Sequence, residues 1–228
     1  MIRAVIFDLD NTLVDFMGMK RQAVDAAIGA MMDAGMKLTH EQIKLNIDKI
    51  YTEQGIEYQK VFDQLLQESL GYVDFRILSA GIIAYRRARE AALKPYPHVT
   101  ATLMKLVKSN IKLAVVSDAP AREAWLRLCY MNFHHIFDVV VTFDDTGERK
   151  PGPKPFQMAL SKLNVQANEA IMSGDWAEPD MVRAKNVGMI TAFAQYGDVF
   201  GTQEAQSDYV LKDIKQLLEI LDKHNTPE

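Results

Sequence analysis

The sequence predicts an α/β fold: a doubly wound, mostly parallel sheet with helices on both faces, and a second, all-helical domain inserted into it. Three observations predict this class. Short apolar runs recur along the 228 residues, amphipathic helical patterns separate most of them, and the stretch between the first two runs is far longer than a crossover needs. A chain of this length can bury a full core without disulfides.

The apolar runs are continuous rather than alternating, as expected for strands that are buried on both faces of a parallel sheet. They lie at residues 4–7, 111–116, 137–141, 170–172 and 189–193, with a weaker run at 209–211. Two helical faces are clear between and after them, one with Val99, Leu103, Leu106 and Val107 and the other with Ile214, Leu217, Leu218 and Leu221. Asp213 is the predicted N-cap of the last helix.

The long stretch at residues 15–95 is the predicted insert. Its apolar residues recur at helical spacing, and residues 39–42 (Thr-His-Glu-Gln) have the form of a capping box at a helix start. A proline-containing segment at residues 94–98 then breaks the helical pattern. We therefore predict an α/β core of residues 1–14 and 96–228 and an inserted helical domain of residues 15–95.

Composition and charge exclude several classes of protein. Hydrophobic residues make up 48% and charged residues 25% of the chain, which is typical of a globular protein rather than a disordered one. Cys129 is the single cysteine, so neither an internal disulfide nor a cysteine-based zinc cluster is expected. The net charge of -4 and the lack of a long basic run argue against a nucleic-acid partner.

The sequence also bears on location. No apolar run reaches the ~18 residues of a transmembrane helix, so no membrane partner is expected. Residues 1–8 lack the longer apolar region and the small-residue cleavage site of a signal peptide, and the single cysteine favours a reducing compartment. We expect a cytoplasmic protein that is a monomer or a homodimer.

Chemically active side chains follow the predicted strands, at the sheet edge where open α/β sheets bind ligands. Asp8 and Asp10 stand two apart after the first run, so on an extended segment their side chains point the same way. Holding two negative charges this close costs free energy unless a cation neutralises them or one carboxylate takes a proton. Asp175, after the fourth run, would complete an oxygen-rich site suited to Mg²⁺. Ser117 and Lys150, after the second and third runs, add a donor and a positive charge. This set is suited to phosphoryl transfer.

Four sequence segments resemble the motifs of the haloacid dehalogenase (HAD) superfamily, and they occur in that superfamily's order. They are FDLDNTL at 7–13, VVSD at 115–118, KPGPKPF at 150–156 and GDWAEPD at 174–180. The resemblance implies a HAD-like Rossmannoid core in which the helical insert is a cap domain. The insert, including residues 61–85, resembles most the archaeal branch whose members are named glyceraldehyde-3-phosphate phosphatases.

The resemblance also implies a role for each catalytic residue. Asp8 would be the nucleophile that attacks phosphorus to give an aspartyl-phosphate. Asp10 would protonate the leaving oxygen and then activate the water that hydrolyses the intermediate. Ser117 would donate a hydrogen bond to a phosphoryl oxygen, and Lys150 would hold Asp8 and the phosphate oxygens together electrostatically.

Mg²⁺ is the cofactor that the resemblance implies. Asp175 would bind it together with the Asp8 carboxylate and the backbone carbonyl of Asp10. Asp180 would orient a metal-bound water from the second shell rather than bind the ion directly. The expected partner of the site is a small phosphorylated substrate.

The predicted activity is therefore that of a HAD-superfamily phosphoric monoester hydrolase acting on a small metabolite, with glyceraldehyde 3-phosphate as one candidate. Asp10 favours this activity over the superfamily's carbon–halogen hydrolases, which usually lack an acid there because a halide leaves without a proton. A sugar-phosphate mutase would use the same residues and stays open, as does an inactive protein of the same fold. A phospho-accepting receiver with Asp144 as acceptor is the alternative from another class, although receivers typically have adjacent acids after the first strand and no large insert there.

Three positions depart from the superfamily's pattern. Ala119 follows Ser117 and Asp118 where glycine is frequent. Trp176 is bulky for the position after Asp175, and Arg183 replaces a small residue. None of these changes removes a catalytic group.

Overall fold

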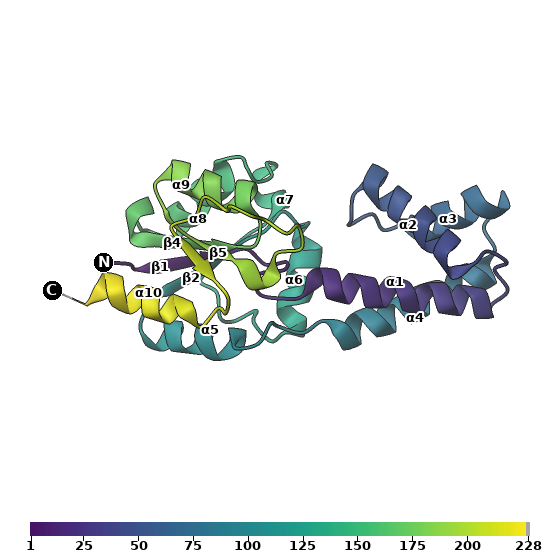
Figure 1. Ribbon diagram of the computed structural model, residues 1–228, viewed down its shortest axis with the longest axis horizontal. Helices are drawn as coiled ribbons and strands as arrows, with labels where there is room; N and C mark the ends of the chain where they lie inside the picture. The colour runs from purple at the N-terminus through teal and green to yellow at the C-terminus, as the bar shows by residue number, and fades with distance from the viewer. Residues whose placement is uncertain (227–228) are drawn as a thin grey trace. The chain divides into compact units, whose positions relative to one another are not determined.

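The computed structural model describes residues 1–226, and the chain divides into two compact units. One unit contains Met1–Phe16 together with the chain from Lys94 onward, and the other contains Met17–Leu93. The first is an α/β unit and the second is helical (Figure 1).

The α/β unit is built on a six-stranded sheet in the order β3-β2-β1-β4-β5-β6, and every pair of neighbouring strands is parallel. The strands are β1 (Ala4–Phe7), β2 (Lys112–Val116), β3 (Val139–Val141), β4 (Ala170–Gly174), β5 (Ile190–Ala194) and β6 (Tyr209–Leu211). The predicted fold class is confirmed. The third strand is shorter than the apolar run at 137–141 that predicted it.

Helices cover both faces of the sheet, which explains why the strand sequences are apolar throughout (Figure 1). On one face, α8 (Lys154–Leu163) and α9 (Arg183–Val187) pack on the strands, and Phe156 joins Ala4 and Ile6 in one core cluster. On the other face lie α5 (Val99–Lys108) and α10 (Gln216–Asn225). The unit also contains α6 (Ala121–Tyr130), α7 (Phe143–Thr146), the π-helix η2 (Ala177–Val182), and the 3-10 turns η1 (Ala167–Glu169) and η3 (Gln195–Gly197).

The start of the last helix differs from the prediction. Residues 212–215 form bends and turns, so α10 begins at Gln216 and Asp213 is not its N-cap. The Asp213 carboxylate instead accepts a hydrogen bond from the Lys215 amide (3.0 Å) and lies 2.7 Å from His98 Nδ1.

The helical unit is formed by α1 (Phe16–Asp33) from its second residue onward, α2 (His40–Gln54), α3 (Val61–Leu70) and α4 (Phe75–Ala92). The predicted capping box at the start of α2 is confirmed, since Thr39 Oγ1 accepts from the Gln42 amide and Gln42 Oε1 accepts from the Thr39 amide. All four helices contribute apolar side chains to one core, among them Ile28, Ile43, Leu65 and Ile77. Among residues 1–226, no helix is both long and apolar enough to cross a membrane.

The strand order changes direction between β1 and β4. From β1 the chain builds the sheet outward through β2 and β3, and β4, β5 and β6 then extend it on the opposite side of β1. In register, Phe7 pairs with Ser173, so the carboxyl ends of β1 and β4 lie side by side. Such a topological switch point is where doubly wound sheets bind their ligands.

Candidate active site

The segment after β1 folds into a tight loop at this switch point. The Asp8 amide still donates to the Ser173 carbonyl (2.9 Å) in the manner of a parallel ladder. The chain then reverses through Asn11, whose left-handed backbone (φ 58°) is a conformation that asparagine tolerates better than most residues. The neighbouring loop after β5 fixes this turn, because Tyr196 donates its hydroxyl to the Thr12 carbonyl (2.8 Å).

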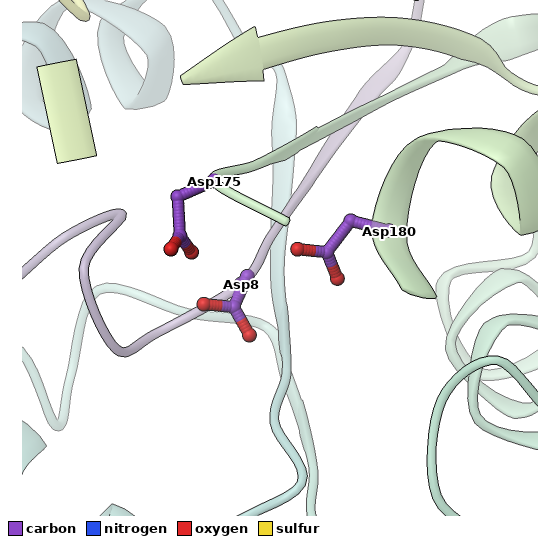
Figure 2. Close-up of side chains that lie close together, drawn as sticks. All are labelled: Asp8, Asp175 and Asp180. Carbon is purple, nitrogen blue, oxygen red and sulfur yellow. The ribbon is translucent and has the colours of Figure 1, made fainter. Parts of the chain in front are cut away.

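Three carboxylates meet at the carboxyl ends of β1 and β4. Asp8 follows β1, Asp175 follows β4, and Asp180 comes from the π-helix η2. Figure 2 shows their carboxyl groups turned toward a shared region, and one oxygen of each lies within 4.8 Å of the others. All three residues are buried. A turn of π-helix is rare and occurs frequently at functional sites, which fits its position here.

Lys150 connects two of these carboxylates. Its Nζ lies 2.5 Å from Asp8 Oδ1 and 2.6 Å from Asp180 Oδ1, and its side chain is as buried as theirs. The lysine is held in place by its own backbone, because the Lys150 amide donates to Asp118 Oδ1 (2.8 Å). The Lys150–Pro151 peptide bond is cis.

The site holds more negative charge than the lysine can neutralise. Burial, opposed by Lys150, raises the pKa of Asp8 to about 7. Burial and the charges of Asp8 and Asp180 raise the pKa of Asp175 to about 9. Burial alone would lower the pKa of Lys150, but the charges of Asp180 and Asp8 outweigh it and raise that pKa, so the ammonium is the cation of the site.

The residues present fit a hard divalent cation. Three carboxylates and one ammonium leave two negative charges in excess when all are ionised, and one divalent cation would neutralise them. The clustered donors are carboxylate oxygens, the ligands that Mg²⁺ prefers. Thr12 Oγ1 also donates to Asp175 Oδ1 (3.1 Å), a contact of the kind that orients metal-binding carboxylates.

The other predicted site residues are placed as follows. Ser117 is buried at the end of β2, beside β1, and its Oγ accepts from the Ala119 amide (3.2 Å). Asp10 Oδ2 lies 3.1 Å from Arg127 Nη1 on α6. Asp144, the acceptor of the receiver alternative, lies in α7 outside the carboxylate cluster, and its Oδ2 accepts from the Ala121 amide (2.7 Å).

The three departures from the family pattern also have clear positions. Ala119 is buried beside Ser117. Trp176 is 48% exposed and stacks on Phe200, with ring centroids 5.1 Å apart. Arg183 begins α9, and its Nε is buried without a hydrogen-bond partner among residues 1–226.

Three residues of the site were not assigned a role from the sequence. Thr12 and Asp118 lie within the motif segments at 7–13 and 115–118, but no sequence pattern indicates that Thr12 contacts Asp175 or that Asp118 accepts from the Lys150 amide. Arg127 lies on α6, outside the four motif segments. The sequence contains no spacing that would connect Arg127 to Asp10, because their contact depends on how α6 lies against the loop after β1.

The chain is similar to known proteins over most of its length. Residues 5–194 match the family described as haloacid dehalogenase-like hydrolase, a span that includes all four motifs. The chain belongs to the haloacid dehalogenase-like hydrolase family. This membership confirms the expected class of enzyme, and relatives with phosphatase names support the phosphatase branch of it.

Two of these relatives are archaeal proteins named glyceraldehyde 3-phosphate phosphatase. The one from Methanocaldococcus jannaschii is 33% identical, with 97% of each chain covered. The one from Methanothermobacter thermautotrophicus is 34% identical, with 97% of this chain and 100% of the relative covered. Among solved structures, a HAD phosphatase from Thermococcus onnurineus matches the fold with a TM-score of 0.72 at 22% identity, covering 96% of this chain and 98% of the other.

Proposed function

We propose that this protein is a Mg²⁺-dependent phosphatase that hydrolyses a small phosphorylated metabolite through an aspartyl-phosphate. Glyceraldehyde 3-phosphate, the substrate in the names of the two archaeal relatives, is the first ester to test. The observation that carries the proposal is the buried Asp8 carboxylate, held by Lys150 at the end of β1 with Asp175 and Asp180 close by.

In the first step, Asp8 acts as the nucleophile. One carboxylate oxygen of Asp8 forms a bond to phosphorus while the bond from phosphorus to the ester oxygen breaks. Lys150 and Ser117 bind phosphoryl oxygens, so charge is stabilised where it develops. Asp10 gives its proton to the leaving oxygen, and the alcohol departs.

In the second step, Asp10 acts as the base. It removes a proton from a water molecule, which attacks phosphorus, and the bond between phosphorus and Asp8 breaks to release inorganic phosphate. Asp175, oriented by Thr12, would hold Mg²⁺ together with Asp8 and the backbone carbonyl of Asp10. Asp180 is engaged by Lys150 and by the Trp176 amide (3.2 Å), which supports a place outside the ligands. The ion would supply the positive charge that offsets the excess of carboxylates and phosphate.

The proposal is tested by phosphate release from a panel of small esters, with Mg²⁺ and with EDTA. Asp8→Asn is the catalytic blank and should abolish turnover. Asp144→Asn is the matched control, since it removes a carboxylate outside the cluster and should leave turnover close to that of the wild type. Metal-dependent release that persists in Asp8→Asn would refute the nucleophile.

A second readout separates the phosphatase from the receiver alternative. In Asp10→Asn the breakdown of the intermediate should be slow, so a phosphorylated peptide containing Asp8 should accumulate and disappear on treatment with hydroxylamine. The wild type should lose that label rapidly. A wild-type acyl-phosphate that lasts, without release of phosphate, would favour the receiver alternative.

A further inference from the structure

Arg127 is a buried cation that the catalytic motifs do not contain. It lies on α6, is 5% exposed, and its Nη1 lies 3.1 Å from Asp10 Oδ2. Its guanidinium carbon also lies 4.4 Å from the centroid of the Phe16 ring. Burying an arginine is costly unless its charge is compensated, so a buried arginine indicates a specific partner.

The surroundings of Arg127 restrict where its charged group can lie. Its stem emerges from a helix, and the ring of Phe16 supports the guanidinium in a cation–π contact. A guanidinium is planar and remains protonated, so it keeps its positive charge at any working pH. Arg127 can therefore hold a carboxylate in one place.

Asp10 is the residue that needs to be held. It stands on the loop after β1, and an acid or base must lie within hydrogen-bond reach of the proton it transfers. The contact with Arg127 uses Oδ2, and because the carboxyl group is planar, fixing one oxygen restricts the position of the other. An error of about 1 Å in such a position can cost about 100-fold in rate.

We propose that Arg127 is a positioning residue that holds the Asp10 carboxyl group in place for proton transfer to the leaving oxygen. The proposal rests on the proposed phosphatase function. It assigns Arg127 no contact with the substrate, and it explains why a charged side chain is buried beside the apolar Ala124 and Leu128 of the same helix.

The test compares two esters with different leaving groups. p-Nitrophenolate leaves without a proton, whereas the alkoxide of glycerol phosphate needs one. Arg127→Met, which keeps an apolar stem, should lower kcat/KM for glycerol phosphate by about 10–100-fold and kcat/KM for p-nitrophenyl phosphate much less, because kcat/KM reports only the steps up to departure of the leaving group. Arg127→Lys should recover part of the loss, and Arg127→Met should add little to Asp10→Asn. Arg122→Met changes an exposed arginine of the same helix and should match the wild type.

The outcomes distinguish this proposal from the proposed function. A wild-type chain that releases no phosphate from either ester refutes both. If the wild type is active, an unchanged Arg127→Met refutes the positioning role alone. Equal losses with both esters, together with a further full loss in the Asp10→Asn background, would show that Arg127 only stabilises the fold. If Arg127→Met folds poorly, the same comparison of the two esters is made with Arg127→Lys.

Discussion

The carboxylate of Asp180 fills the space that a side chain at Gly174 would need. A Cβ placed on Gly174 would lie 2.3 Å from Asp180 Oδ2, far inside van der Waals contact. Glycine at the end of β4 therefore allows Asp180 to approach the strand, and from there Asp180 contacts Lys150. The lysine is in this way fixed from two sides, by Asp180 and by Asp8.

Gly174→Ala should disable the site without unfolding the sheet. The new methyl group would push Asp180 away and break its 2.6 Å contact with Lys150, so we expect kcat/KM to fall by about 100-fold. The control is Gly29→Ala in α1, where nothing lies within 4 Å of the new Cβ. It should keep full activity and raise stability by up to ~1 kcal/mol. Wild-type kcat/KM in Gly174→Ala would contradict the role of this close approach.

Thr12→Val should weaken metal binding more than it weakens the fold. Thr12 is fully buried and donates to Asp175 Oδ1, so its loss frees the orientation of that carboxylate. We expect the Mg²⁺ concentration for half-maximal activity to rise by about 10–100-fold. Ser173→Ala is the matched control, since Ser173 Oγ is buried without a hydrogen-bond partner within residues 1–226. A similar shift in both variants would argue against a specific role for Thr12.

The effect of metal on stability should depend on pH. The folded-state pKa values of Asp8 (about 7) and Asp175 (about 9) lie above the ordinary value of 3.8, so between these values the folded protein binds more protons than the unfolded chain. Stability without metal should therefore fall as pH rises from about 4 to 9. On the proposed function, Mg²⁺ would bind the ionised carboxylates and remove this penalty.

We therefore expect the rise in Tm on adding Mg²⁺ to be larger at about pH 8.5 than at about pH 5.5. Thermal unfolding with Mg²⁺ and with EDTA measures it, and Asp175→Asn should lose most of the effect. An equal rise in Tm at both pH values, or one that survives in Asp175→Asn, would place the stabilising ion elsewhere.

The strand pattern predicted the sheet because both of its faces are covered. Every residue of β1 is fully buried, so the sequence shows a continuous apolar run that a half-exposed strand would not have. The third strand was predicted too long for a local reason. Asp138 accepts from the Leu113 amide through its side chain (2.8 Å), and Phe137 packs edge-on against Phe7, so these residues support the sheet without belonging to β3.

The convergence of acids at the site followed from topology, because parallel strands end at one edge of the sheet. The sheet topology does not predict the contacts that side chains on the flanking helices make with the site. Asp180 approaches Gly174 from the π-helix η2, and no residue pattern indicates that geometry. Arg127 reaches Asp10 from the face of α6 that also buries Ala124 and Leu128, and nothing in the sequence indicates that contact. The catalytic roles of these residues stay predictions until the variants are measured.

Thr39→Ala should destabilise the helical unit alone. Thr39 Oγ1 accepts from the Gln42 amide (3.3 Å), and removing an N-cap of this kind costs about 1 kcal/mol. Both tryptophans, Trp125 and Trp176, lie in the α/β unit, so their fluorescence reports on that unit, and hydrogen exchange of the α2 amides is the better measurement.

Thr52→Ala is the control in the same helix. Its hydroxyl donates to the Asp48 carbonyl (2.9 Å), a contact that adds little to a helix interior, so protection should be kept or increased. Equal loss of protection in both variants would show that α2 depends on threonine packing rather than on its cap.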